Sequence, residues 1–129
     1  MRRDLRRVML VEDDPDVQIV ASMSLTDIGG FEVLVCGSGA EALEAAPRFS
    51  PDLILMDVMM PGGDGPSIVP KLLAVPETCK TPVVFLTARV QPADLARYRE
   101  VGCLDVIPKP FDPSALPDLL KAIWARQDE

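Results

Sequence analysis

Six polar residues that could do chemistry follow or end short apolar runs of the chain. They are Glu12, Asp13, Asp14, Asp57, Thr87 and Lys109. Carboxylates that gather in one place repel one another and lose hydration, so a cation has to balance them. Mg2+ suits such a set because it prefers oxygen ligands and is often shared between carboxylates and a phosphate. The chain contains no histidine, which argues against a transition-metal site.

A magnesium site of this kind suits phosphoryl transfer, in which the protein mainly positions the reactants and neutralises charge. Asp57 is the predicted nucleophile and would form an aspartyl phosphate. Each residue alone has a plainer interpretation, since an acidic pair after a strand often caps the next helix. The prediction of a magnesium site therefore depends on the polar residues at all of these strand ends taken together.

Five apolar runs, each typical of a strand, could bring these residues together. They span Arg7–Val11, Phe31–Cys36, Leu53–Asp57, Val83–Thr87 and Asp105–Ile107. Segments with helical spacing follow them, at Asp16–Ile28, Ala40–Arg48, Ser67–Ala74, Ala93–Val101 and from Ser114 to about Arg126. Strict alternation predicts an α/β fold with a parallel sheet covered on both faces. In such sheets the ligand crevice lies at the carboxyl ends of the strands.

Length and composition limit what the chain can do. Its 129 residues fit one domain, with a core at about 6–126 and no room for a separate output module. The net charge of -7 argues against direct nucleic-acid binding, and no apolar stretch is long enough for membrane insertion. The three cysteines are predicted to be reduced, partly buried thiols of a cytoplasmic protein.

Four motifs in order give the chain a specific resemblance. They are MLVEDDPDV, LILMDVMMPGGDG, VVFLTA and PKPF. With them the sequence resembles the CheY-like receiver domains of two-component response regulators over essentially its whole length. The resemblance implies a doubly wound, five-stranded parallel sheet of strand order 2-1-3-4-5, flanked by five helices.

Carried over position by position, the resemblance assigns a role to each site residue. Glu12, Asp13 and Asp57 would hold Mg2+ together with the backbone carbonyl of Met59, and Asp57 would also accept the phosphoryl group. Thr87 would hydrogen-bond a phosphoryl oxygen, Lys109 would pair with it, and the Lys109–Pro110 peptide would be cis. Asp14 and Asp64 are expected to cap or turn the chain.

Two positions depart from the family pattern or are unusual in physical terms. Receivers of this kind usually carry an aromatic residue, which turns inward on activation, at the position of Val106. Coupling in this chain is therefore expected either to run through backbone shifts of the loop at 88–92 or to be weak. Met59 places an apolar side chain, and Arg89 a mobile cation, where an attacking water would be oriented, so slow self-dephosphorylation is expected.

The function that follows is that of a signalling phosphoacceptor, not of an enzyme with a separate substrate. A sensor histidine kinase or phosphotransfer protein would phosphorylate Asp57, and a downstream protein target would recognise the switched surface of a monomer or weak dimer. Two alternatives remain open. A magnesium phosphatase would need a D-x-D pair, which Asp57 and Met59 do not provide. A binding module that no longer uses phosphate would fit Val106.

Overall fold

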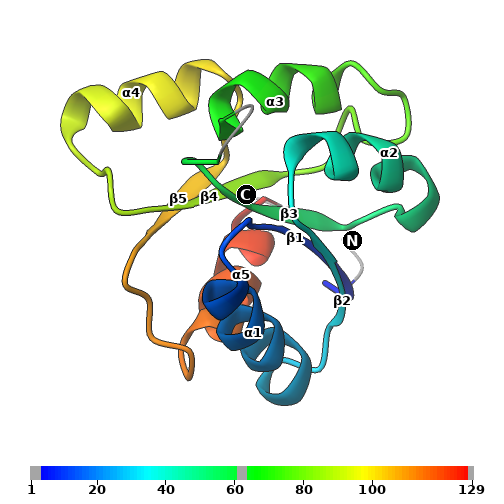
Figure 1. The fold of residues 1–129 in the computed structure, drawn as a ribbon, viewed down its shortest axis with the longest axis vertical. Coiled ribbons are helices and arrows are strands. Elements are labelled where there is room, and N and C mark those ends of the chain that lie inside the picture. The colour runs from blue at the N-terminus through cyan, green and yellow to red at the C-terminus, as the bar shows by residue number, and fades with distance from the viewer. Residues whose placement is uncertain (1–3, 61–63, 128–129) are drawn as a thin grey trace.

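The computed structural model describes residues 4–60 and 64–127, which form alternating strands and helices (Figure 1). The strands are β1 (Arg7–Val11), β2 (Glu32–Cys36), β3 (Leu53–Asp57), β4 (Val83–Thr87) and β5 (Asp105–Pro108). The helices are α1 (Pro15–Met23), which continues as the π-helical turn η1 (Ser24–Ile28), α2 (Gly39–Phe49), α3 (Gly65–Leu73), α4 (Pro92–Glu100) and α5 (Leu116–Arg126).

The five strands form one parallel sheet in the order β2-β1-β3-β4-β5. The predicted fold class and strand order are therefore confirmed. The order reverses direction between β1 and β3, so the carboxyl ends of these two strands open the crevice in which doubly wound sheets bind ligands. Val11 of β1 pairs with Met56 of β3, which places the residues that follow Val11 next to Asp57.

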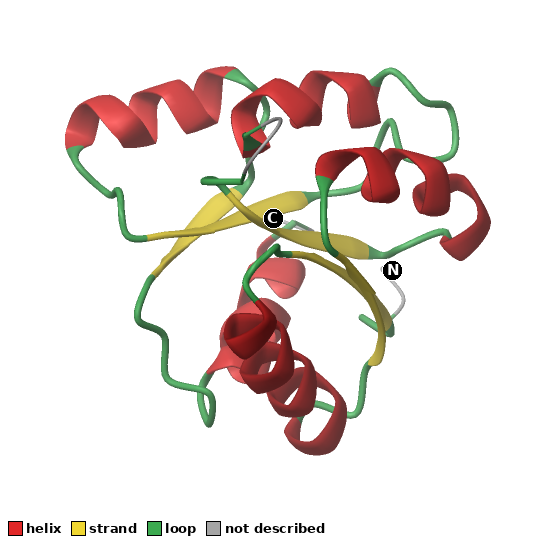
Figure 2. Ribbon diagram, viewed as in Figure 1, coloured by secondary structure: helices red, strands yellow, loops and turns green. Residues whose placement is uncertain are grey.

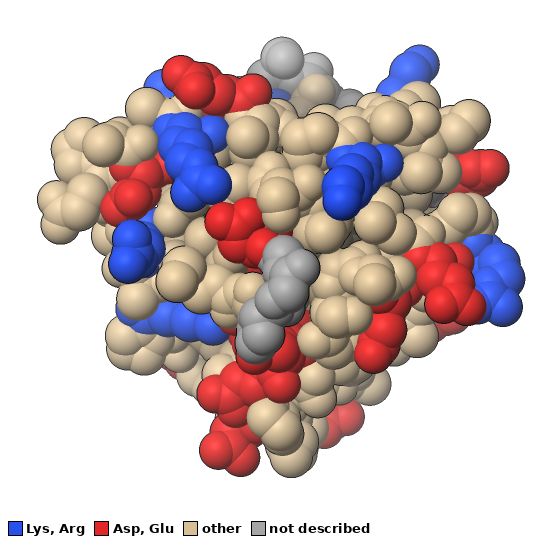
Figure 3. Space-filling view, turned by 45° about the horizontal axis from the view of Figure 1, so that its top comes forward, with Lys and Arg blue, Asp and Glu red and all other residues tan. Residues whose placement is uncertain are grey.

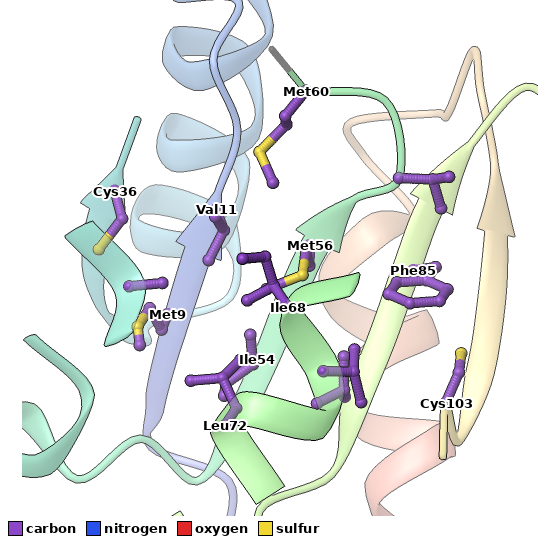
Figure 4. Close-up of a cluster of buried hydrophobic side chains, with 14 of the residues drawn as sticks. Met9, Val11, Cys36, Ile54, Met56, Met60, Ile68, Leu72, Phe85 and Cys103 are labelled. Atoms are coloured by element: carbon purple, nitrogen blue, oxygen red, sulfur yellow. The ribbon is translucent and has the colours of Figure 1, made fainter. Parts of the chain in front are cut away.

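Helices cover both faces of the sheet. Helices α2, α3 and α4 lie on one face, and α1 and α5 lie on the other (Figures 1 and 2). Alternate residues of each strand enter the two cores, so that Met9 and Ile54 pack under the first layer while Leu10 and Leu55 pack under the second. Figure 4 shows the first core, in which Ile68 and Leu72 of α3 approach the strand side chains.

Strands β3 and β4 have nearly continuous apolar sequences and are buried along their whole length. Burial on both faces removes the need for polar residues except where a strand ends. Asp57 and Thr87, the last residues of β3 and β4, are the polar exceptions within these strands. The core thus packs against both faces of these strands up to the residues of the site.

Most predicted boundaries lie close to those observed, and the differences have local causes. Helix α1 begins at Pro15 because Asp14 accepts a hydrogen bond from the Asp16 N–H. The last helix begins at Leu116 and not at Ser114, because the Asp112 carboxylate accepts both the N–H and the hydroxyl of Ser114 in a preceding turn. The second strand begins at Glu32, although Phe31 is buried.

The prediction of partly buried cysteines is wrong for one of the three. Cys36 and Cys103 are buried, whereas Cys79 is exposed in the loop between α3 and β4. Trp124 is buried against the sheet. None of the helices in residues 4–60 and 64–127 combines the length and apolar character that crossing a bilayer requires.

Candidate functional site

Three carboxylates meet at the carboxyl ends of β1 and β3. Each of Glu12, Asp13 and Asp57 offers one carboxylate oxygen, and these oxygens lie within 4.8 Å of one another. Glu12 and Asp57 are 0% and 5% exposed, whereas Asp13 is accessible to solvent. The structure therefore brings together the three side chains that the sequence analysis predicted as metal ligands.

Lys109 supplies a positive charge to this cluster from the end of β5. Its Nζ lies 3.0 Å from Glu12 Oε1 and 3.3 Å from Asp57 Oδ1. Its backbone N–H donates to the Thr87 carbonyl at 2.9 Å, which fixes the lysine relative to β4. The Lys109–Pro110 peptide is cis, as predicted.

Backbone and side-chain donors orient the two buried carboxylates. The Met59 N–H donates to Asp57 Oδ1 at 3.1 Å, and the Asp14 N–H donates to Glu12 Oε2 at 3.1 Å. Gln18 of α1 donates from Nε2 to the backbone carbonyl of Glu12 at 2.5 Å. Gln18 is not among the predicted site residues, because a glutamine on a helix carries no signal of its own.

Burial and nearby charges shift the pKa values of Glu12 and Lys109. Burial raises the pKa of Glu12 to about 7, against the lowering by the Asp14 N–H and Lys109, and Asp57 adds to the rise. Desolvation acts to lower the pKa of Lys109, but the hydrogen bond to Glu12 and the charge of Asp57 hold it above its ordinary value. Burial is thus the main cause of the raised pKa of Glu12, and Lys109 opposes it without cancelling it.

Thr87 ends β4 and is 1% exposed. Its Oγ1 accepts the Arg89 N–H at 3.0 Å, which ties the hydroxyl to the following loop. Its neighbour Ala88 is exposed and leaves the surface beside the strand end open. The threonine is thus placed at the strand end adjacent to Asp57, as the sequence predicted.

Two nearby acids play structural parts. Asp14 caps α1, and Asp64 caps α3 by accepting the Ser67 N–H at 3.0 Å. Asp64 also pairs with Arg97 of α4 at 3.4 Å. The Met59 side chain is 55% exposed beside Asp57. These placements agree with the expectation that neither Asp14 nor Asp64 belongs to the chemical centre.

The donor set fits a hard divalent cation. The three carboxyl groups offer only oxygen ligands, and they outnumber the ammonium of Lys109 that contacts two of them. Asp and Glu side chains also gather over the lower middle of one face of the molecule, with most Lys and Arg above and to the side (Figure 3).

Comparison with known proteins agrees with this geometry. The sequence model of the response regulator receiver domain matches residues 8–121. The chain is 37% identical over 119 residues to the probable transcriptional regulator ycf29 of Porphyra purpurea, which covers 92% of this chain and 56% of that protein. It is 35% identical over 120 residues to the response regulator Rre1 of Synechocystis, which covers 93% and 52%.

Solved structures agree as well. The chemotaxis protein CheY4 of Vibrio cholerae superposes with a TM-score of 0.87 at 29% identity, over 92% of this chain and 98% of that one. The receiver domain of the sensor histidine kinase PA1611 from Pseudomonas aeruginosa superposes with a TM-score of 0.83 at 30% identity, over 93% and 98%, and holds a magnesium ion in its active site cleft.

The chain therefore belongs to the response regulator receiver domain family, with a CheY-like fold. Receiver domains are signalling phosphoacceptors that interact with histidine kinases or phosphotransfer proteins, and they bind Mg2+ at an acidic pocket. The chain spans about half the length of the curated relatives that it matches.

Proposed function

We propose that this chain is a phosphoaccepting receiver module in which Asp57 takes a phosphoryl group from a histidine kinase or phosphotransfer protein in a Mg2+-dependent reaction. The observation that carries the proposal is the buried cluster in which Lys109 contacts both Asp57 and Glu12. Three free cysteines suit a reducing compartment, so we place the module in the cytoplasm, as a single domain over about residues 6–126.

In the reaction, a carboxylate oxygen of Asp57 attacks the phosphorus of a donor phosphohistidine. The new O–P bond forms as the P–N bond breaks, and the departing imidazole nitrogen keeps the electron pair. One Asp57 oxygen is already held by the Met59 N–H and Lys109, which leaves the other as the nucleophile. Bound Mg2+, held by Glu12, Asp13, Asp57 and the Met59 carbonyl, would offset charge on the phosphoryl oxygens.

Lys109 and Thr87 would stabilise the product. The ammonium lies 3.3 Å from the acceptor carboxylate, so it can follow the negative charge from that carboxylate to the phosphoryl oxygens. The Thr87 hydroxyl can donate to one of those oxygens. Both residues gain a stronger partner on phosphorylation, which supplies the free-energy difference that a switch needs.

A surface beside the site suits the donor protein. Ile19, Val20 and Met23 of α1 are exposed apolar residues. Val20 also lines a cavity of about 410 Å³ that reaches Lys109 and Phe111. A donor that brings its phosphohistidine to Asp57 would contact this flank, and the apolar side chains would bind it.

Incubation with acetyl phosphate and Mg2+ tests the chemistry. We expect a mass gain of one phosphoryl group that is stable in acid and labile in base, and no gain in Asp57→Asn. An unmodified wild-type chain under these conditions would contradict the proposal. It would favour the alternative of a binding module that does not use phosphate.

Charge introduced on α1 tests the donor surface. In Val20→Asp, transfer from a purified phosphotransfer domain that phosphorylates the wild-type chain should fall, while labelling by acetyl phosphate should not change. Asp27→Lys, a charge change farther along the same segment, is the control. Equal transfer to Val20→Asp and wild type would exclude this surface.

A further inference from the structure

A buried tyrosine joins α4 to the loop that follows β4. Tyr98 is the only tyrosine in the sequence and is 1% exposed. Its hydroxyl donates to the Arg89 carbonyl at 3.0 Å. Its ring meets the Phe85 ring edge-on, with centroids 5.1 Å apart and an interplanar angle of 82°. The ring is therefore held by β4 and the hydroxyl by the loop.

The same loop residue is hydrogen-bonded to the phosphorylation site. The Arg89 N–H donates to Thr87 Oγ1 at 3.0 Å, while the Arg89 carbonyl accepts from Tyr98. Two hydrogen bonds thus lead from Thr87 through the Arg89 backbone to α4. The two backbone groups of Arg89 lie on either side of one Cα, so a shift of the Thr87 hydroxyl can reach the Arg89 carbonyl through this short stretch of backbone.

Space for a second position of the ring lies beside β5. Val106 pairs in register with Phe85 and is half-buried against the same core as Tyr98. A cavity of about 300 Å³ adjoins Tyr98 and is lined by Val106, Leu95 and Val90. A valine at position 106 leaves this volume open, and a larger side chain there would reduce it.

We propose that Tyr98 is the aromatic residue through which the phosphorylated state of Asp57 acts on α4. This inference rests on the proposed function. A phosphoryl oxygen is a stronger acceptor than the groups now around Thr87, so it draws the Thr87 hydroxyl towards Asp57. The Arg89 backbone then moves, and the Tyr98 hydroxyl loses its acceptor. The ring turns into the cavity beside Val106 and carries α4 with it.

Two states follow, and they differ by one hydrogen bond that the unphosphorylated state alone makes. A group that stabilises only one state weakens the binding of any ligand that favours the other state. Binding of that ligand in turn disfavours the state that the group stabilises. Tyr98 is therefore a positioning residue that restrains the unphosphorylated conformation. Removal of its hydroxyl should favour the phosphorylated conformation without any contact with the phosphoryl group.

Ring-labelled tyrosine tests the movement directly in the unaltered chain. The carbon-13 NMR signals should come from the ring of Tyr98 alone. They should change chemical shift when Mg2+ and beryllofluoride, a phosphoryl mimic, are added. The single Trp124 side chain, which lies on the other face of the sheet, is an internal control and should shift little. Asp57→Asn should abolish the tyrosine shift.

The Tyr98→Phe variant tests the hydrogen bond, since it keeps the ring against Phe85. Beryllofluoride should bind about fivefold more tightly than to wild type, which is the size that the net loss of one hydrogen bond allows. Signals from α4 should lie partly towards their mimic-bound positions before the mimic is added. Thr78→Val is the matched control, because Thr78 is a buried hydroxyl that donates to the Leu72 carbonyl away from the site.

The outcomes separate this inference from the proposed function. If the mimic binds and shifts the amides of Asp57 and Lys109, but the tyrosine signals stay unchanged and Tyr98→Phe binds it as wild type does, the role of Tyr98 is excluded while phosphorylation stands. If Thr78→Val tightens binding equally, the effect is a general loss of stability and the inference fails. If no mimic binds, the proposed function itself fails.

Discussion

Glu12 combines a carboxyl group with complete burial. Its carboxylate is satisfied by the Asp14 N–H and by Lys109, yet burial still raises its pKa to about 7. A buried carboxyl costs free energy once it ionises, unless a second cation shares the charge. The charge of Glu12 should therefore depend both on pH and on the binding of a metal ion.

The pKa of Glu12 predicts a pH dependence of stability in the metal-free protein. Between the unfolded value of 4.5 and about 7, the folded chain keeps a proton that the unfolded chain has released. The contribution of Glu12 to the free energy of unfolding therefore decreases as pH rises through this window, by at most about 3 kcal/mol. Below pH 4.5 the carboxyl group is protonated in both the folded and the unfolded chain, so its contribution to stability no longer changes with pH.

Urea unfolding in EDTA from pH 4.5 to 8 measures this term. The difference in the free energy of unfolding between wild type and Glu12→Gln should change between pH 4.5 and about 7 and level off at higher pH. A difference that is constant with pH would show that the folded-state pKa of Glu12 is ordinary.

Met59 predicts the lifetime of the aspartyl phosphate. Its exposed thioether side chain lies beside Asp57 and offers no strong hydrogen bond to an attacking water. Self-dephosphorylation is therefore expected to be slow. Met59→Asn should accelerate it by about tenfold, less than a full general base supplies. Decay of phosphorylated protein after removal of acetyl phosphate gives the rate, with Met59→Leu as the control that should not differ from wild type.

At the scale of elements, α3 approaches the backbone of β3, the strand that ends in Asp57, closely. A Cβ at Gly65 would lie 3.0 Å from both the Asp57 carbonyl oxygen and Cε1 of Phe85. The Gly65 N–H also donates to the Val58 carbonyl at 2.9 Å. Only glycine allows the helix to begin this near Asp57 without moving the β3 backbone or Phe85.

Gly65→Ala should therefore impair both stability and chemistry. We expect a loss of about 1–3 kcal/mol in the free energy of unfolding, as for overpacking, and slower labelling by acetyl phosphate. Gly30→Ala is the control, because Gly30 has a φ of +73° and open space around it. That variant should lose about 1 kcal/mol through backbone strain and keep its labelling rate. Equal labelling rates in the two variants would show that Gly65 has no special role.

The elements themselves were largely predictable, since each strand is an apolar run of about the observed length. The start of α5 was missed because the Asp112 side chain stabilises a turn whose polar residues also suit a helix cap. The burial of Tyr98 was missed because α4 carries charged residues on either side of it. The hydrogen bonds that the Arg6 and Arg7 N–H groups donate to Asp52 could not be predicted from the sequence either, because an Asp that follows a proline is typical of an ordinary turn.

For the whole molecule, the order of the strands could not be obtained from apolar periodicity. Any neighbour order buries the same five runs, so the order came from the resemblance that the motifs carry. The predicted site was more robust, because parallel strands place all of their carboxyl ends at one edge whatever the order. The structure then brought Glu12, Asp13, Asp57 and Lys109 together as expected.

A ligand that binds the folded chain alone should stabilise it as a whole. At a free Mg2+ concentration about 100 times the dissociation constant, the free energy of unfolding should rise by about 2.7 kcal/mol. Differential scanning calorimetry with and without Mg2+ measures the change in Tm. Asp57→Asn should lose most of the increase, and an equal increase in both proteins would place the binding elsewhere.

The cysteines have a practical consequence for experiments on this chain. Burial raises the pKa of the Cys36 and Cys103 thiols to about 11, so both resist alkylation at neutral pH. Cys79 is exposed before the amino-terminal end of β4, whereas Thr87 and the acidic cluster lie at the carboxyl ends of the strands. A maleimide dye or surface linker should attach there selectively. The tethered protein would then present the edge of the sheet that carries the acidic cluster to solution.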